Sequence, residues 1–108
     1  MPRVTFEVES TAEPILIVST RDAEGRPISQ QVDLRPVDAG RRTGSITVAN
    51  RQTHTLTWIC TGNPGTQYKI TLEPRNRVTL RRSRNPIESR IATTRLMTTG
   101  SDQFEVEP

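Results

Sequence analysis

Apolar and polar residues alternate along most of this chain with the two-residue period of a β-strand. Near the N-terminus, Val4, Phe6 and Val8 alternate with threonine and glutamate, which is typical of a strand with one buried face and one face in solvent. The same alternation runs from Thr53 to Cys60, with threonines on one face, and from Gln67 to Leu72. Threonine is β-branched and favours the exposed face of a pleated strand. The pattern therefore predicts an all-β protein.

Further strands are expected between these segments. Pro14–Val18 is a continuous apolar run, which predicts a central strand covered on both faces. Ile28, Gln30, Val32 and Leu34 occupy alternate positions and predict a single strand that ends before the next proline. Shorter alternations predict three more strands, which contain Ile46 and Val48, Val78 and Leu80, and Phe104 and Val106.

Turn residues separate these strands. Asp22–Pro27 and Asp38–Gly40 have turn chemistry, since glycine supplies a positive φ and proline interrupts a strand. Thr61–Gly65 joins two strong strands and predicts a hairpin between them. Asn85–Ile91 fits either a short helical turn, with Asn85 as its cap, or an extended edge segment. Seven to nine short strands with turns at this spacing predict an antiparallel β-sandwich.

Length and composition narrow the class of protein. The chain has 108 residues, which predicts one domain, residues 1–108. No segment approaches the apolar length of a membrane span, and the N-terminus lacks the apolar core of a secretion signal, so we expect a soluble chain. One cysteine and one histidine exclude an internal disulfide framework and a tetrahedral zinc site built from these residue types. No metal or other cofactor is expected.

The residue types needed for nucleophilic catalysis are present but badly spaced. His54 and Cys60 share a strand face, with Trp58 between them, and six strand residues separate them by about 20 Å. A Cys–His nucleophile pair needs hydrogen-bond contact, so this spacing excludes the pair within the strand. The pattern indicates instead a buried thiol, a histidine at the rim of the core, and a tryptophan between the sheets.

Paired carboxylates are the second candidate for chemistry. Glu7 and Glu9 share one strand face, and so do Glu105 and Glu107. Such pairs suit acid–base catalysis or calcium binding, but glutamates that alternate with apolar residues are also typical of a solvated strand face, and we favour that interpretation. The sequence contains no glycine-rich phosphate loop, serine elbow or metal motif. It therefore predicts that the protein is not an enzyme.

Charge is distributed unevenly along the chain. Residues 1–40 contain four arginines and seven acids, and residues 41–95 contain ten arginines and Lys69 against two acids. Residues 96–108 contain three acids and no base. Arginine pairs bidentately with carboxylate, sulfate or phosphate. The basic middle of the chain could therefore bind an anionic ligand, or it could pair with the acidic ends in adjacent strands.

The segment Arg75–Arg95 has the highest density of arginine, with seven arginines and one acid, Glu88. An anion-binding surface in it would consist of Arg75, Arg77, Arg81, Arg82 and Arg84. Such a row suits phosphate or sulfate groups. The lack of aromatic residues between Tyr68 and Phe104 argues against a platform for single-stranded nucleic acid. The competing interpretation is a charged edge strand that pairs with glutamate-bearing strands and resists aggregation.

Two segments resemble pieces of the immunoglobulin-like and prealbumin-like β-sandwich domains of bacteria. Val18–Ile28, followed by Val32 and Leu34, is similar to their opening hairpin. Pro64–Leu72 is similar to a later loop and strand, with Tyr68 near the start of the strand. Together the segments cover roughly a quarter of the chain. The resemblance implies an immunoglobulin-like sandwich and transfers no site residue.

These features predict a non-enzymatic binding or assembly module that acts through an edge strand or through the Arg-rich face. Its expected partner is another protein or a second copy of the chain, since an apolar content of 31% makes a lean core. The alternative is a binder of polyanion or carbohydrate that uses Arg75–Arg95. Salt dependence separates the two, because binding to a polyanion weakens steeply as salt rises and strand pairing does not.

Overall fold

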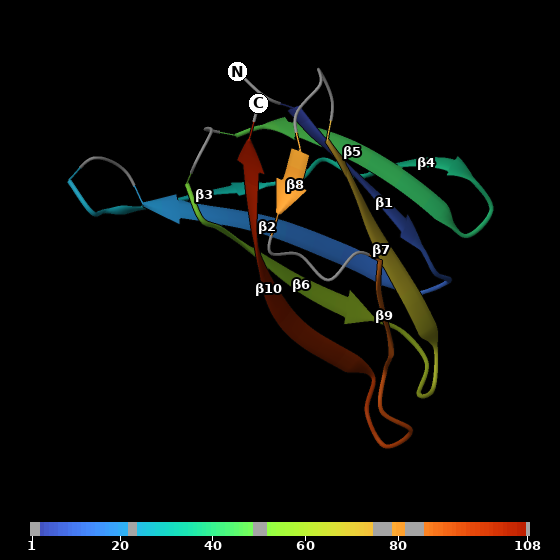
Figure 1. Ribbon diagram of the computed structural model, residues 1–108. Coiled ribbons are helices and arrows are strands. Elements are labelled where there is room, and N and C mark those ends of the chain that lie inside the picture. The colour runs from blue at the N-terminus through green and yellow to red at the C-terminus, as the bar shows by residue number, and fades with distance from the viewer. Residues whose placement is uncertain (1–2, 22–23, 49–51, 75–78, 82–85, 108) are drawn as a thin grey trace.

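The chain folds as an antiparallel β-sandwich (Figure 1). The computed structural model describes residues 3–21, 24–48, 52–74, 79–81 and 86–107. Within these ranges all regular structure is β-strand, and no helix that could span a membrane is present. The ten strands are β1 (Arg3–Glu9), β2 (Glu13–Arg21), β3 (Pro27–Gln31), β4 (Arg35–Asp38), β5 (Arg41–Thr47), β6 (His54–Thr61), β7 (Gln67–Pro74), β8 (Thr79–Arg81), β9 (Ile87–Arg90) and β10 (Met97–Glu107). The predicted all-β sandwich is confirmed, with more strands than the seven to nine expected.

The strands form two five-stranded sheets that pack face to face. The first sheet has the order β4-β5-β1-β7-β9, and the second has the order β3-β2-β6-β10-β8. Every pair of neighbouring strands is antiparallel. The middle strands, β1 and β6, are the two segments in which the sequence alternates most regularly. A middle strand has its inner face fully covered, so the alternation is under the strongest constraint there.

The core lies between the two sheets and comes from the alternating positions. On β1 the buried residues are Val4, Phe6 and Val8. The inner face of β6 consists of His54, Leu56, Trp58 and Cys60. Phe6 of the first sheet and Phe104 of the second make an edge-to-face contact, with their ring centroids 6.2 Å apart. The alternation therefore identified the inward residues correctly on both middle strands.

The predicted hairpin around Thr61–Gly65 is wrong. β6 pairs with β2 and β10 in the second sheet, whereas β7 pairs with β1 and β9 in the first. The loop therefore carries the chain from one sheet to the other, and Gly65 within it adopts a φ of 82°. Alternation determines which side chains face inward but not which strands pair, because both arrangements bury the same residues.

The segment predicted as one strand from Ile28 to Leu34 is a strand only as far as Gln31, and the chain then crosses to the other sheet. β3 pairs with β2 in the second sheet, and β4 pairs with β5 in the first. The buried Val32 lies where the chain crosses between them. There the backbone passes over Gly44 of β5, and a Cβ added to Gly44 would lie 2.4 Å from the carbonyl oxygen of Asp33. The crossing thus needs a glycine at this position.

The run Pro14–Val18 forms part of β2, which lies between β3 and β6 as a central strand should. The expectation that both of its faces are covered is wrong. Leu16 and Val18 are buried, but Ile15 is 41% exposed. A two-layer sandwich covers one face of each sheet and leaves the other in solvent.

The C-terminal part of the chain is extended. Within the predicted segment Asn85–Ile91, residues Ile87–Arg90 form β9, which pairs with β7, so the helical-turn alternative is wrong for them. Ile87 is buried opposite Ile70 and anchors this strand. The last strand, β10, is eleven residues long and reaches well beyond the short Phe104–Val106 segment that the alternation indicated.

Candidate functional site

The predicted Arg-rich surface falls mostly outside the described residues. Its members there are Arg75, Arg77, Arg82 and Arg84. Arg81 is the last residue of β8, and its Cα is paired with that of Glu105 on β10. Arg81, the one described member of the predicted surface, therefore lies on a strand next to a glutamate. The interpretation of this segment as a charged edge strand that pairs with glutamate-bearing strands expects this arrangement. The anion-binding surface stays a prediction.

The outer face of the first sheet carries opposite charges on neighbouring strands. Arg41 of β5 has its Nε 2.9 Å from Oε1 of Glu7 on β1. Lys69 of β7 has its Nζ 4.0 Å from Oε1 of Glu88 on β9. These side chains are partly exposed, so each pair contributes little to stability. Glu7 and Arg41 show that the acidic start of the chain meets its basic middle across adjacent strands.

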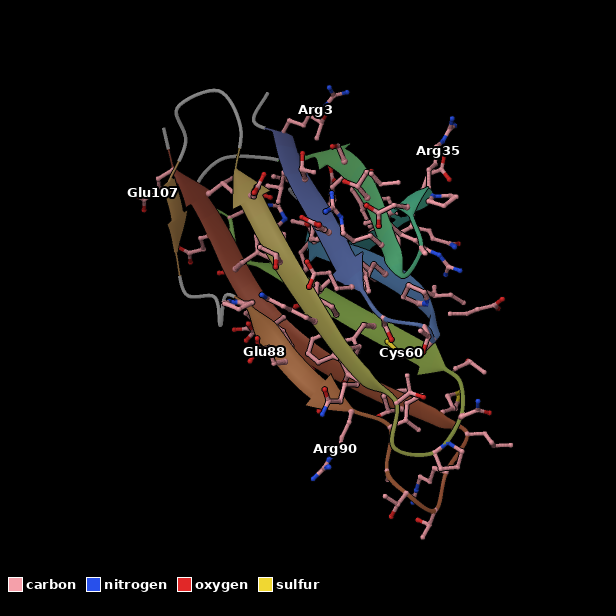
Figure 2. All side chains as sticks on the ribbon, turned by 90° about the vertical axis from the view of Figure 1, so that its right-hand side faces the viewer. Arg3, Arg35, Cys60, Glu88, Arg90 and Glu107 are labelled. Atoms are coloured by element: carbon pink, nitrogen blue, oxygen red, sulfur yellow. The ribbon has the colours of Figure 1, made fainter. Side chains whose placement is uncertain are left out.

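An open groove of about 860 Å³ lies at one end of this charged face. Its charged lining residues are Glu9, Lys69, Glu88 and Arg90, of which the last two are labelled on β9 in Figure 2. Two acids and two bases leave no excess of either sign.

The residues considered for nucleophilic chemistry are buried. Cys60 is a free thiol with no solvent exposure, and burial raises its pKa to about 11. A protonated thiol is a poor nucleophile. His54 is also buried, where its Nδ1 is hydrogen-bonded to the hydroxyl of Thr20 and its ring lies 5.2 Å from that of Phe104. Among the described residues no cluster of His, Cys, Asp and Glu could hold a metal ion.

Each sheet ends in two edge strands, and three of these four strands carry features that hinder pairing with a further strand. β4 contains Pro36, and its register with β5 shifts between Pro36 and Asp38. β9 carries the charged residues Glu88 and Arg90. β8 contains Arg81 and spans three described residues. Proline, irregular register and charge are features by which proteins block pairing at sheet edges.

β3 differs from the other three edge strands. Its five residues, Pro-Ile-Ser-Gln-Gln, are uncharged and all exposed, and they pair with β2 in an unbroken register. Pro27 stands at the first position, where a strand tolerates proline. Ile28 is 55% exposed. We call the side of β3 that faces away from β2 the free edge.

The register between β2 and β3 determines which backbone N–H and C=O groups of β3 point to the free edge. The N–H of Val32 donates to the carbonyl oxygen of Leu16 at 2.9 Å, so these opposed residues form a hydrogen-bonded pair. Hydrogen-bonded and non-hydrogen-bonded pairs alternate along an antiparallel ladder, and Ser29 and Gln31 therefore direct their N–H and C=O groups to the free edge. The 2.9 Å contact between the hydroxyls of Ser19 and Ser29 agrees, because side chains approach most closely in non-hydrogen-bonded pairs.

A hollow of about 180 Å³ lies under the inner face of β3, at one end of the sandwich. Its lining includes Val18, Ile28, Gln30, Val48 and His54. The side chain of Gln30 donates to the carbonyl oxygen of Thr47 at 3.3 Å and so links β3 to the end of β5. Inner-face side chains of a strand added at the free edge would lie next to this partly apolar hollow.

The hairpin of β2 and β3 extends past the neighbouring strand. Registered pairs between β2 and β6 end at Ser19, but those between β2 and β3 continue to Arg21 and Pro27. Figure 1 shows this hairpin reaching beyond the rest of the second sheet. The free edge of β3 is therefore accessible from outside the body of the molecule.

The sequence predicted that an edge strand or the Arg-rich face would act but did not indicate which edge strand. The run from Pro27 to Gln31 lacks charge in a chain of which 25% is charged, and this was the available signal. It was insufficient, because central strands such as β6 also lack Asp, Glu, Lys and Arg. Comparisons of this chain with protein-family models, with curated proteins and with solved structures find no match. The candidate site therefore rests on geometry.

Proposed function

We propose that this chain is a non-enzymatic binding or assembly module that accepts an extended polypeptide strand at the free edge of β3. The observation that carries the proposal is the contrast between the four sheet edges. β4 has proline with an irregular register, β8 and β9 contain charged residues, and β3 is uncharged, exposed and regular. An edge with these properties is a template for another strand.

The backbone of β3 would provide most of the affinity. Ser29 and Gln31 each present an N–H donor and a C=O acceptor to an incoming strand. In strand addition, main-chain hydrogen bonds give affinity and the pockets under alternate side chains give specificity. Main-chain recognition alone selects no particular sequence, so specificity must come from the side chains.

The hollow beneath β3 favours an added strand that has apolar residues on its inner face. It places the apolar side chains of Val18, Ile28 and Val48 beside the inner face of that strand. Successive side chains of a strand point to opposite faces. A ligand strand with apolar residues at every second position would therefore cover the hollow and keep its polar residues on the solvent side.

Two substitutions at one position test the proposal. Gln31→Pro removes an N–H that faces the free edge, and an edge strand tolerates proline where the N–H faces solvent. Gln31→Val keeps the N–H and suits a strand. The probe is a set of short synthetic peptides in which apolar and polar residues alternate, with binding measured by calorimetry.

We expect the proline variant to lose about tenfold in affinity, the equivalent of about one hydrogen bond, and the valine variant to bind like the original chain. A thermal melt of each variant establishes that it is folded. Equal binding by both variants, or no binding of any peptide to the original chain at concentrations where it is monomeric, would contradict the proposal.

A further inference from the structure

The free edge of β3 is complementary to itself. If two copies meet about a two-fold axis perpendicular to the sheet, their β3 strands run antiparallel, and Ser29 lies opposite the Ser29 of the second copy. Both backbone groups of Ser29 face the free edge, so the two residues would exchange a pair of hydrogen bonds. Gln31 would donate its N–H to the carbonyl oxygen of Pro27 in the other copy. The missing N–H of Pro27 removes one bond at each end of the ladder.

The side chains of β3 also suit a symmetric pair. A two-fold axis brings a residue near its own copy, so a charge at the centre of the strand would repel itself. β3 carries no charge at any of its five positions. Ile28, now 55% exposed, would lie opposite Gln30 of the second copy, on the side of the hollow. Pairing would thus withdraw the exposed isoleucine from water.

The position of β3 leaves room for a second molecule. The hairpin of β2 and β3 extends past β6 (Figure 1), which separates the paired strands from the bulk of each copy. Closed two-fold symmetry occupies both free edges at once. β4 and β9 keep their own protection in such a pair, and β8 pairs with the end of β10 from Glu105 to Glu107.

We infer that the strand bound at the free edge of β3 is β3 of a second copy of this chain, and that two second sheets join into one continuous ten-stranded sheet. This inference rests on the proposed function and names its partner. It predicts a homodimer whose centre is Ser29. The charged outer face of the first sheet takes no part in the contact.

A symmetric disulfide tests the register. In a hydrogen-bonded antiparallel pair the Cα atoms lie about 5.5 Å apart, a separation that a disulfide spans. Ser29→Cys should therefore give a covalent dimer under mild oxidation. Ser101→Cys is the matched control, since Ser101 is an exposed serine on β10 of the same sheet, away from the free edge of β3. The buried Cys60 is common to both variants.

We expect Ser29→Cys to cross-link at least about tenfold faster than Ser101→Cys, because pairing holds the two thiols at a high effective concentration. Sedimentation equilibrium over a concentration series should show a dimer for the original chain and a weaker dimer for Gln31→Pro. A monomer at every concentration, or equal cross-linking of the two cysteine variants, would overturn the inference. If the chain is monomeric but peptides bind and Gln31→Pro weakens them, the proposed function stands and the second copy is not the partner.

Discussion

At the scale of single residues, the packing of Trp58 depends on a residue with no side chain. Trp58 is opposite Gly100 in the register of β6 and β10, and a Cβ added to Gly100 would lie 2.3 Å from the indole ring. Glycine inside a strand often marks a place where another group approaches closely. The tryptophan is buried between the sheets, as the sequence predicted, and the space above Gly100 is what admits it.

Cys60 gives the stability of the protein a dependence on pH. Burial raises the pKa of its thiol from 9.0 to about 11, because an apolar environment disfavours the thiolate. As pH rises, the unfolded chain therefore loses this proton before the folded chain does. The contribution of the neutral thiol is complete below pH 9 and is lost between pH 9 and about 11.

We expect the free energy of unfolding of the original chain to fall more steeply over that interval than the free energy of unfolding of Cys60→Ala. Urea titrations at a series of pH values measure both, and the difference between the curves isolates the thiol from other titrating groups. The labelling rate of native Cys60 at neutral pH provides a check. Labelling as fast as in the urea-unfolded chain would mean that the thiol is not buried.

At the scale of strands, the pairing of β8 with β10 bears on the two interpretations of the Arg-rich segment. The Cα of Arg81 is the register partner of the Cα of Glu105. Opposite charges on directly opposed residues stabilise a sheet by about 0.2–1 kcal/mol. A double-mutant cycle with Arg81→Ser and Glu105→Gln should therefore show a coupling of about that size in the free energy of unfolding.

A heparin-affinity measurement over a salt series completes this test. If Arg81 is engaged in strand pairing, we expect Arg81→Ser/Arg82→Ser to lose stability, and the original chain to bind heparin no better than this variant. Arg35→Ser is the control, since Arg35 is an exposed arginine on the opposite sheet that projects into solvent (Figure 2). Binding at low salt that falls steeply with salt and disappears in the double variant would favour the polyanion alternative.

At the scale of the whole molecule, one buried hydrogen bond joins the two sheets. The indole N–H of Trp58 on β6 donates to the hydroxyl of Tyr68 on β7 at 3.0 Å, and both residues are buried. Tyr68→Phe keeps the ring and leaves the indole N–H without this acceptor. We expect it to lower the free energy of unfolding by about 1–3 kcal/mol, the usual effect of leaving a buried donor unsatisfied.

Chemical denaturation of Tyr68→Phe, of Trp58→Phe and of the double variant measures the contribution of this hydrogen bond to the free energy of unfolding. With Trp58 already replaced, the tyrosine hydroxyl has lost this donor, so the two effects should not add. Additive effects, or a Tyr68→Phe variant as stable as the original chain, would show that the bond does not hold the sheets together.

The two outer faces of the sandwich also differ as whole surfaces. The first sheet presents charged side chains that include Glu7, Arg41 and Lys69. The centre of the second presents Ile15 and Ile59, which lie opposite each other, among threonines. Strand addition at β3 would extend the second of these faces and leave the charged one unchanged. The charged face would therefore stay in water in an assembly formed through β3, and its charges would favour the solubility of that assembly.

The side chains that face inward on the regular strands can be assigned from the amino-acid sequence alone. A two-residue period is a property of one strand and needs no partner, so Val4, Phe6 and Val8, and the inner face from His54 to Cys60, were assigned correctly. The all-β class follows from the same pattern. The turn around Gly40 was also predictable, because the φ of 78° there is local chemistry.

The pairing of strands and the positions of the sheet edges became known from the folded structure. Pairing joins residues far apart in the chain, and the loop at Thr61–Gly65 is compatible with a hairpin or with a crossing between sheets. The same limit applies to the candidate site. Pro27–Gln31 is a strand in either case, but it is a site because β2 covers one side of it and no described strand covers the other. That asymmetry arises from the order of strands in a sheet, which alternation along a single strand does not encode.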